Sequence, residues 1–518
     1  MSDKTKQNRE QPEATDTAER PVETATCNAI SIRWRFACLL PAFVVFMVYW
    51  LSAPKKFHED EVYWIGSTYY FQLALIDRNA SSPDWQLLPA RENPAIGKYI
   101  LGTALHWSGN SVSTPDLLGS FYLMFANMPG AWGSDEAFAK RLAVANRVAP
   151  EWHDAVRTGR DLPLNEAQLS VARNTSFLFG VLASIGIAVL GQQCNWKAGG
   201  VIAGILFALH PIVIDAYSLA MIDIIAIACS VWFLVGLVSI LRLPTPEVPV
   251  DNEKGQAQAV AKNVTSRKTL QTKNTEGSLR LPDTISVKRF ACVLFTAVML
   301  ALACGSKMNS LIVAMTGAVC GMWCVFETTR RIFTKRNSVQ QNSKSHHNSA
   351  DTLAGNLEIW KSRTYALGGA AVLAVIIFIG SNPALYVDPV DGVHALSYEH
   401  ALTADIQEDI LGGRLTSLAA RFKALANLVC FSPWAFTGIC VAVIWTAYNC
   451  MKKQTLGIIL VLWWIIALLL LILWMPFAWD RYALPLITPT MLILGMTLEK
   501  AANLGWSMVT RANRTVVS

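Results

Sequence analysis

The stretch Leu456–Trp474, LGIILVLWWIIALLLLILW, decides the class of fold. It contains no charged side chain, and a helix of about 20 apolar residues is long enough to cross the hydrocarbon core of a bilayer. The whole chain has the same character: of its 518 residues, 53% are hydrophobic and 16% are charged, and its mean hydropathy is +0.34. Soluble domains carry about 25% charged residues, so this composition indicates a membrane protein.

Nine further apolar segments lie before and after this stretch in the sequence. Together the ten predict an all-α polytopic membrane protein of about ten transmembrane helices. The predicted spans are Trp34–Leu51, Val171–Leu190, Gly199–Ile214, Leu219–Leu241, Phe290–Cys304, Asn309–Phe326, Tyr365–Gly380, Leu425–Tyr448, Leu456–Trp474 and Tyr482–Leu498.

The polar segments between the spans define the expected orientation. Residues 244–288 and 328–363 are basic, low-complexity linkers, which we expect to be disordered and cytoplasmic. Residues 1–33 are interpreted as a disordered cytoplasmic tail and residues 501–518 as a cytoplasmic C-terminal tail. Residues 53–169 then form a long first extracytoplasmic loop.

Charge and cysteine content exclude several classes of protein. The net charge of +7 comes mostly from Lys and Arg between the apolar spans. These residues are expected to set topology, so no nucleic-acid partner is predicted. Most of the 11 cysteines lie inside apolar runs, and no polar loop holds a metal-binding pair of them. We therefore expect neither a disulfide framework nor a metal site.

The acidic stretch His58–Glu61, HEDE, follows the first apolar segment and precedes several aromatic residues. One interpretation is a solvated acidic turn whose carboxylates pair with Lys55 and Lys56. The other is a general base whose proton affinity is set by low dielectric and by neighbouring carboxylates.

The first loop contains one apolar stretch that is too short to span a bilayer and one longer polar segment. Asn93–Trp107, NPAIGKYILGTALHW, fits an interfacial or re-entrant helix. Residues 133–169 are expected to form extracytoplasmic helices that lie on the membrane.

Four motifs appear in order along the chain, and all fall on the predicted outer face. The first motif has two parts, Asp60-Glu61 with Tyr63 and Glu92-Asn93-Pro94 with Gly97-Lys98. The other three are Ser218 with Asp223, Lys307 in CGSKMNSL, and Arg481-Tyr482 in RYALPLITP. With these motifs the chain resembles integral-membrane glycosyltransferases of the GT-C class, in particular protein O-mannosyltransferases and lipid A aminoarabinose transferases. The resemblance covers residues 34–500. The chain departs from the family pattern at Asn93, Ala95 and Leu219.

The resemblance implies a GT-C-like bundle that transfers a sugar, with inversion, from a polyprenyl-phosphate donor to an acceptor hydroxyl on the extracytoplasmic face. A carboxylate would remove the proton of that hydroxyl. Asp60 is the expected base, with Glu61 as the alternative base or as its orienting partner. The sequence alone does not separate the two.

The leaving phosphate needs positive charge, which Lys98, Lys307 and Arg481 are expected to supply. The remaining candidates for substrate binding are Glu59, Tyr63, Glu92, Asn93, Asp223 and Tyr482. No cofactor is expected, because the lipid-linked sugar phosphate is itself a substrate. Membrane lipids and an acceptor protein, lipid or glycan are the expected partners.

Three other functions stay open at this point. A transporter or flippase for an anionic or lipid-linked substrate would use Asp60, Asp223 and Lys307 as an ion path, but it should show inverted repeats. A ligase with a pyrophosphate-linked donor would favour a late outer loop, and a non-catalytic receptor would favour one soluble module. We expect a bacterial inner membrane with the site facing the periplasm; the endoplasmic reticulum is the alternative.

Overall fold

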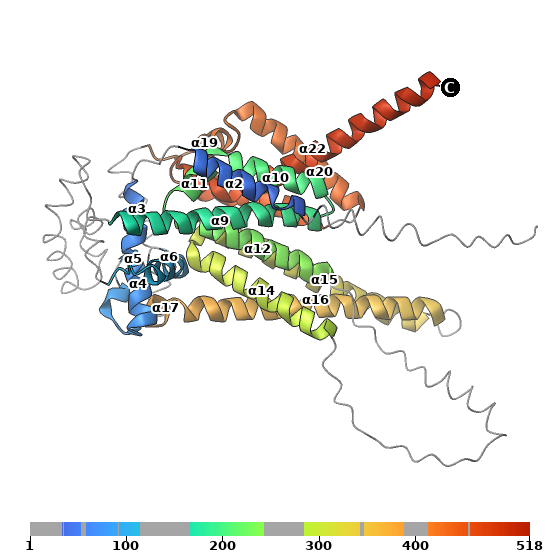
Figure 1. Cartoon of the computed structure of the whole chain (residues 1–518). Coiled ribbons are helices and arrows are strands. Elements are labelled where there is room, and N and C mark those ends of the chain that lie inside the picture. Colours follow the sequence, from blue (N-terminus) through green and yellow to red (C-terminus); the bar gives the residue numbers. More distant parts are fainter. Residues whose placement is uncertain are drawn as a thin grey trace, which may run out of the picture.

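The structure is a computed structural model that describes residues 34, 36–52, 58–86, 88–91, 93–113, 165–242, 284–341, 347–387, 413–453 and 456–517. In these ranges all regular secondary structure is helical (Figure 1). The elements before the first long helix are α2 (Leu40–Leu51), α3 (Glu59–Gly66), α4 (Tyr69–Phe71), η1 (Gln72–Ile76), η2 (Pro83–Gln86), α5 (Leu88–Arg91) and α6 (Ile96–Trp107). The bundle then contains α9 (Glu166–Gln193), α10 (Lys197–Leu209), α11 (Pro211–Ser218), α12 (Ile222–Arg242), α14 (Thr284–Ser306), η4 (Met308–Ser310), α15 (Leu311–Gln341), α16 (His347–Gly380), α17 (Pro383–Val387), α19 (Leu418–Cys430), α20 (Pro433–Lys453), α21 (Ile458–Trp474) and α22 (Asp480–Val517).

The described part of the chain has seven helices long and apolar enough to cross a membrane, which confirms an all-α, multi-pass membrane protein. They lie within α9, α12, α14, α15, α16, α20 and α22. An eighth span results if α10 and α11, which are bent by 69°, are counted as one. The apolar helices α2 and α21 are shorter, at 12 and 17 residues. The total of about ten spans stays a prediction.

Two of the expected spans are broken, and each break has a local cause. Gly199–Ile214 bends at His210, because Pro211 cannot donate a backbone hydrogen bond and disfavours the helical conformation in the residue before it. The prediction of a single span Leu425–Tyr448 was wrong. The chain leaves α19 at Phe431 with a left-handed φ of 58°, and α20 begins only at Pro433.

The prediction that residues 328–363 form a disordered linker was also wrong for the residues that the structure describes. α15 continues to Gln341 and α16 already begins at His347. Polar residues hide this from a hydropathy pattern, but ion pairs at helical spacing stabilise such helices: Glu327 pairs with Arg330 and Arg331.

The structure describes most of the predicted C-terminal tail and only the end of the other linker. α22 runs without interruption to Val517, so residues 501–517 continue the last span as helix. In Figure 1 this end of α22 projects from the bundle. Of the linker 244–288, the last five residues already belong to α14. Residues 1–33, 243–283 and 114–164 lie outside the described residues, and with them the predicted N-terminal tail and most of the predicted surface helices.

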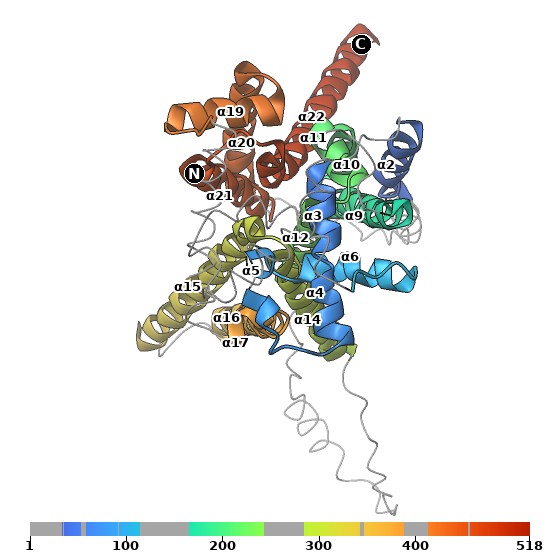
Figure 2. The same cartoon turned by 90° about the vertical axis from the view of Figure 1, so that its left-hand side faces the viewer.

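The first loop forms a layer of short helices over one end of the long helices (Figures 1 and 2). It has an aromatic core of its own, in which Tyr70 packs on Trp85 at 5.1 Å between ring centroids. The same cluster includes Ile222 at the start of α12 and Ala303 near the end of α14. The loop is therefore attached to the helix ends that carry the predicted motifs, and α6 is the short helix expected near Asn93–Trp107.

The main core joins α9, α10, α12, α21 and α22. Small residues allow α10 and α22 to approach closely: a Cβ atom built on Gly495 would lie 2.2 Å from the carbonyl oxygen of Gly199. Packing of backbone on backbone through glycine is common where helices associate inside a membrane. This close crossing fixes the position of α22, which begins at Asp480, relative to α10.

Replacing Gly495 by Leu should therefore lower stability, because the added side chain has no room against α10. Overpacking of this kind costs about 1–3 kcal/mol or more. Thermal unfolding in detergent, followed by size-exclusion chromatography, measures the loss. Gly505→Leu on the same helix is the matched control, since nothing lies within 4 Å of its Cβ position. Equal stability of the two variants would contradict the close crossing.

Candidate functional site

The acidic stretch HEDE forms the first turn of α3, and its sequence explains why the helix begins there. His58 is the N-cap residue: its Nδ1 accepts a hydrogen bond from the amide of Asp60 at 3.1 Å. The Glu61 carboxylate accepts one from the amide of His58 at 3.0 Å. This reciprocal arrangement is a capping box, with histidine in the place usually taken by Ser or Thr.

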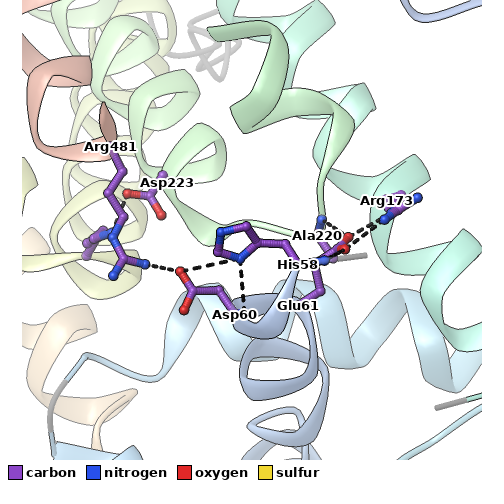
Figure 3. Close-up of polar contacts among 8 residues, drawn as sticks. His58, Asp60, Glu61, Arg173, Ala220, Asp223 and Arg481 are labelled. Carbon is purple, nitrogen blue, oxygen red and sulfur yellow. Dashed lines mark hydrogen bonds and ion pairs between the residues drawn. The ribbon is translucent and has the colours of Figure 1, made fainter. Parts of the chain in front are cut away.

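Glu61 is completely buried and its carboxylate is saturated with hydrogen bonds. Arg173 of α9 donates to both carboxylate oxygens at 2.7 Å, and the amide of Ala220 donates at 2.9 Å. The amide of His58 is the fourth donor (Figure 3). A carboxylate with these four donors is a structural anchor, because both of its oxygens are already bonded within the protein. Of the two candidate bases, Asp60 has the more accessible carboxylate.

Asp60 points away from Glu61, toward Arg481 at the start of α22 (Figure 3). The two side chains form an ion pair, and each is 27% exposed. His58 Nδ1 lies 3.9 Å from the Asp60 carboxylate. The guanidinium of Arg481 also lies over the ring of Trp479, 4.7 Å from its centroid. Asp60 is thus a partly accessible carboxylate beside a cation, and water or a ligand can reach it.

A second ion pair joins Asp223, in the first turn of α12, to Lys307, in the short connection between α14 and η4. Both residues are buried, and the Lys307 ammonium lies 6.0 Å from the centroid of the Trp64 ring. Burial lowers the pKa of Lys307; the charge of Asp223 opposes that shift, and nearby Arg481 adds to it.

The two ion pairs border one narrow pocket of about 20 Å³, enough space for a water molecule. Asp223, Lys307 and Arg481 line it together with Asn309 and Trp463. Among the described residues, three buried polar atoms here have no hydrogen-bond partner: Asp223 Oδ2, Asn309 Nδ2 and Trp463 Nε1. Unpaired buried polar groups are costly, so a ligand or water would be stabilised beside these three atoms, whereas the rest of the lining is mostly apolar.

Lys98, which the sequence predicts to bind the donor phosphate, does not line this pocket. Its side chain is fully buried within the first loop. The ammonium donates to the carbonyl oxygens of Pro89 and of Asn93, the latter at 2.6 Å, and lies 5.4 Å from the ring centroid of Tyr70. Lys98 and Asn93 therefore hold the loop together, and the contact of Lys98 with a donor phosphate stays a prediction.

The aromatic and acidic candidates lie around the two ion pairs in different ways. Tyr63 is buried and packs edge-on against Trp64 at 4.7 Å between ring centroids. Tyr482 stacks on Trp479 at 5.5 Å, beside Arg481. Glu59 begins α3, but its side chain lies outside the described residues, as does all of Glu92.

Elsewhere in the loop, Tyr69 donates a hydrogen bond to Asp84 at 2.7 Å. Burial raises the pKa of Tyr69, and the bond to Asp84 raises it further. The phenol therefore stays neutral at physiological pH and serves to hold the loop.

Sequence reasoning missed Arg173, Trp479, Asn309 and Trp463. A signal existed for Arg173, because an arginine inside an apolar helix needs a buried partner. No comparable signal marks the others, whose roles depend on how α21, α22 and η4 meet.

No group of three or more His, Cys, Asp or Glu side chains that could hold a metal ion occurs within the described ranges. Ten of the cysteines lie in these ranges, and all ten are free thiols. Compared with family models, curated proteins and solved structures, the chain has no match.

Replacing Glu61 by Gln should destabilise the protein strongly, since it removes the buried negative charge that pairs with the partly buried Arg173 and one of the two oxygens to which Arg173 donates. Removing one member of a buried ion pair costs about 3–5 kcal/mol. Asp60→Asn on the same turn is the control and should cost less than about 1 kcal/mol, because that pair is partly exposed. Chemical unfolding in detergent micelles measures both. A Glu61→Gln protein as stable as Asp60→Asn would show that the anchor does not form.

Proposed function

We propose that this protein is a glycosyltransferase that moves a sugar from a polyprenyl-phosphate donor to an acceptor hydroxyl. The observation that carries the proposal is the convergence of Asp60, Asp223, Lys307 and Arg481. These residues are far apart in the chain, and each lies at or next to the end of a helix. Together they provide two cations, Lys307 and Arg481, that line one narrow pocket, and an accessible carboxylate, Asp60, that is paired with one of these cations.

In the proposed reaction the acceptor oxygen attacks the anomeric carbon of the sugar while the bond from that carbon to the phosphate oxygen breaks. Asp60 takes the proton of the attacking hydroxyl, and the polyprenyl phosphate leaves as an anion. One carboxylate base is the requirement of an inverting transfer. Glu61, saturated by its four donors, contributes by holding the helix turn that carries Asp60.

Arg481 and Lys307 would bind the donor phosphate by exchanging their carboxylate partners for it. Arg481 suits a bidentate contact, whereas Lys307 acts as a point charge. When the phosphate takes Arg481, Asp60 loses its counter-ion and becomes available as the base. Binding of the donor would in this way prepare the base, so that the two steps occur in order.

The helical environment supports a donor that arrives through the membrane. The site lies where α12 and α22 begin and α14 ends. If these helices span the bilayer, the phosphate of a lipid would be found at this depth. The distribution of Lys and Arg assigns this end to the extracytoplasmic side. We infer a GT-C-like arrangement in the bacterial inner membrane, acting on a hydroxyl of a protein, a lipid or a glycan.

A transporter is the second candidate, and one observation favours it. α10 and α11 form a bent pair, and discontinuous helices frequently border substrate sites in transporters. In that case Asp223 and Lys307 would belong to an ion path. The two candidates differ in whether a carrier lipid is bound and consumed.

The test is purification in nanodiscs followed by mass spectrometry for bound polyprenyl phosphate and its glycosylated form. We expect bound carrier in the unmodified protein. Arg481→Ala should reduce it strongly, because a hydrogen bond to a charged group is worth about 1.5–3 kcal/mol. Lys307→Ala should act in the same direction.

Asp60→Asn should keep the carrier and lose turnover by about 10²–10⁴-fold, as expected for a missing base. Asp77→Asn, an exposed acid in the same loop, and Arg242→Ala at the other end of α12 are the matched controls. Absence of carrier lipid in the unmodified protein, with uptake of a small anion into proteoliposomes, would replace the transferase by the transporter.

A further inference from the structure

A second pocket lies between α14 and α16, away from the ion pairs. It has a volume of about 480 Å³, within the range of roughly 300–1,000 Å³ typical of ligand sites. Arg289, Phe290 and Val293 of α14 form one wall, and Lys361 and Tyr365 of α16 form the other. α14 and α16 are packed side by side (Figure 1), so the groove follows the seam between two predicted spans.

The groove lies at the opposite membrane face from the candidate site. Arg289 precedes Lys307 by 18 residues along α14, and a helix rises 1.5 Å per residue, which separates them by about 27 Å. The hydrocarbon core of a bilayer is about 30 Å thick. If Lys307 lies at one interface, Arg289 therefore lies at the other, where lipid head groups meet the chain.

The polar part of the groove carries a net positive charge. Arg289 and Lys361 face it along with one carboxylate, Glu358, so the lining charges sum to 2 − 1 = +1. Lys361 is bonded to Glu358 at 2.8 Å. An anionic group is the charge complement of this end.

The rest of the lining is apolar and open to the hydrocarbon. Phe290 is 68% exposed and Tyr365 is 76% exposed, although both lie inside the helices Val287–Ser306 and Leu357–Gly380, which are long and apolar enough to cross a membrane. A free anion would use only the cationic end, whereas a lipid uses both parts: its head group meets the cations and its acyl chains cover the aromatic rings. Basic pockets between spans at the cytoplasmic face bind anionic lipids in this way.

We propose that the groove between α14 and α16 is a binding site for an anionic phospholipid of the cytoplasmic leaflet. It is distinct from the donor site and independent of the reaction proposed above. The bound lipid would bridge α14 and α16 at the end where Lys361 and Arg289 face each other across the seam.

The test uses the full chain in nanodiscs of equal parts phosphatidylglycerol and phosphatidylcholine, with native mass spectrometry of the lipid that stays bound. We expect the unmodified protein to retain phosphatidylglycerol in preference. In the double variant Arg289→Gln/Lys361→Gln, the preference for phosphatidylglycerol over phosphatidylcholine should fall about 25-fold, which is about fivefold for each cation removed. Glu358→Gln should increase retention, because it removes the competing carboxylate.

The double variant Lys452→Gln/Arg511→Gln is the matched control. It removes the same charge from exposed positions that do not line the groove, and its retention should equal that of the unmodified protein. Equal loss in both double variants would overturn the site in favour of a general surface-charge effect. Equal retention of the two lipids by the unmodified protein would also overturn it, and would be the result if another segment of the chain filled the groove.

Discussion

The bond between the buried carboxylate of Glu61 and Arg173 is the contact on which the arrangement of this end of the bundle depends. A carboxylate loses much hydration free energy when it is buried, and it is stable there only with a full set of donors. Those donors come from three places: α9, the connection before α12, and the start of α3 itself. The three segments must meet before the charge can be buried, so their relative positions are coupled.

This coupling explains why two neighbouring acids have different roles. Successive residues of a helix point about 100° apart, so Asp60 and Glu61 cannot face the same way. Glu61 faces α9 and fixes the helix, and Asp60 consequently faces α22 and Arg481 (Figure 3). The connection that binds Glu61 through Ala220 leads directly to Asp223. One anchor thus orients a carboxylate in each of the two ion pairs.

Much of this arrangement could be predicted from the sequence, and the exceptions have physical reasons. Apolar length identified the helical membrane fold, and the order of motifs identified Asp60, Asp223, Lys307 and Arg481, which the structure brings together. The role of Lys98 could not be predicted, because a lysine in a loop has the same pattern whether it faces a ligand or backbone carbonyls. The pairing of Glu61 with Arg173 joins residues 112 positions apart, beyond any local pattern. Hydropathy likewise missed the helices in 328–363, where charged side chains stabilise a helix that apolar content does not reveal.

The prolines of α22 have a consequence for Arg481. Pro485 has no amide hydrogen, so it cannot bond the carbonyl oxygen of Arg481 one turn earlier. The first turn of the helix is therefore tied less firmly to the following turns, whereas Gly495 is wedged against α10 further along. The first turn of α22 is thus less constrained than the part of the helix that packs against α10. Arg481, which pairs with Asp60, lies on this less constrained turn.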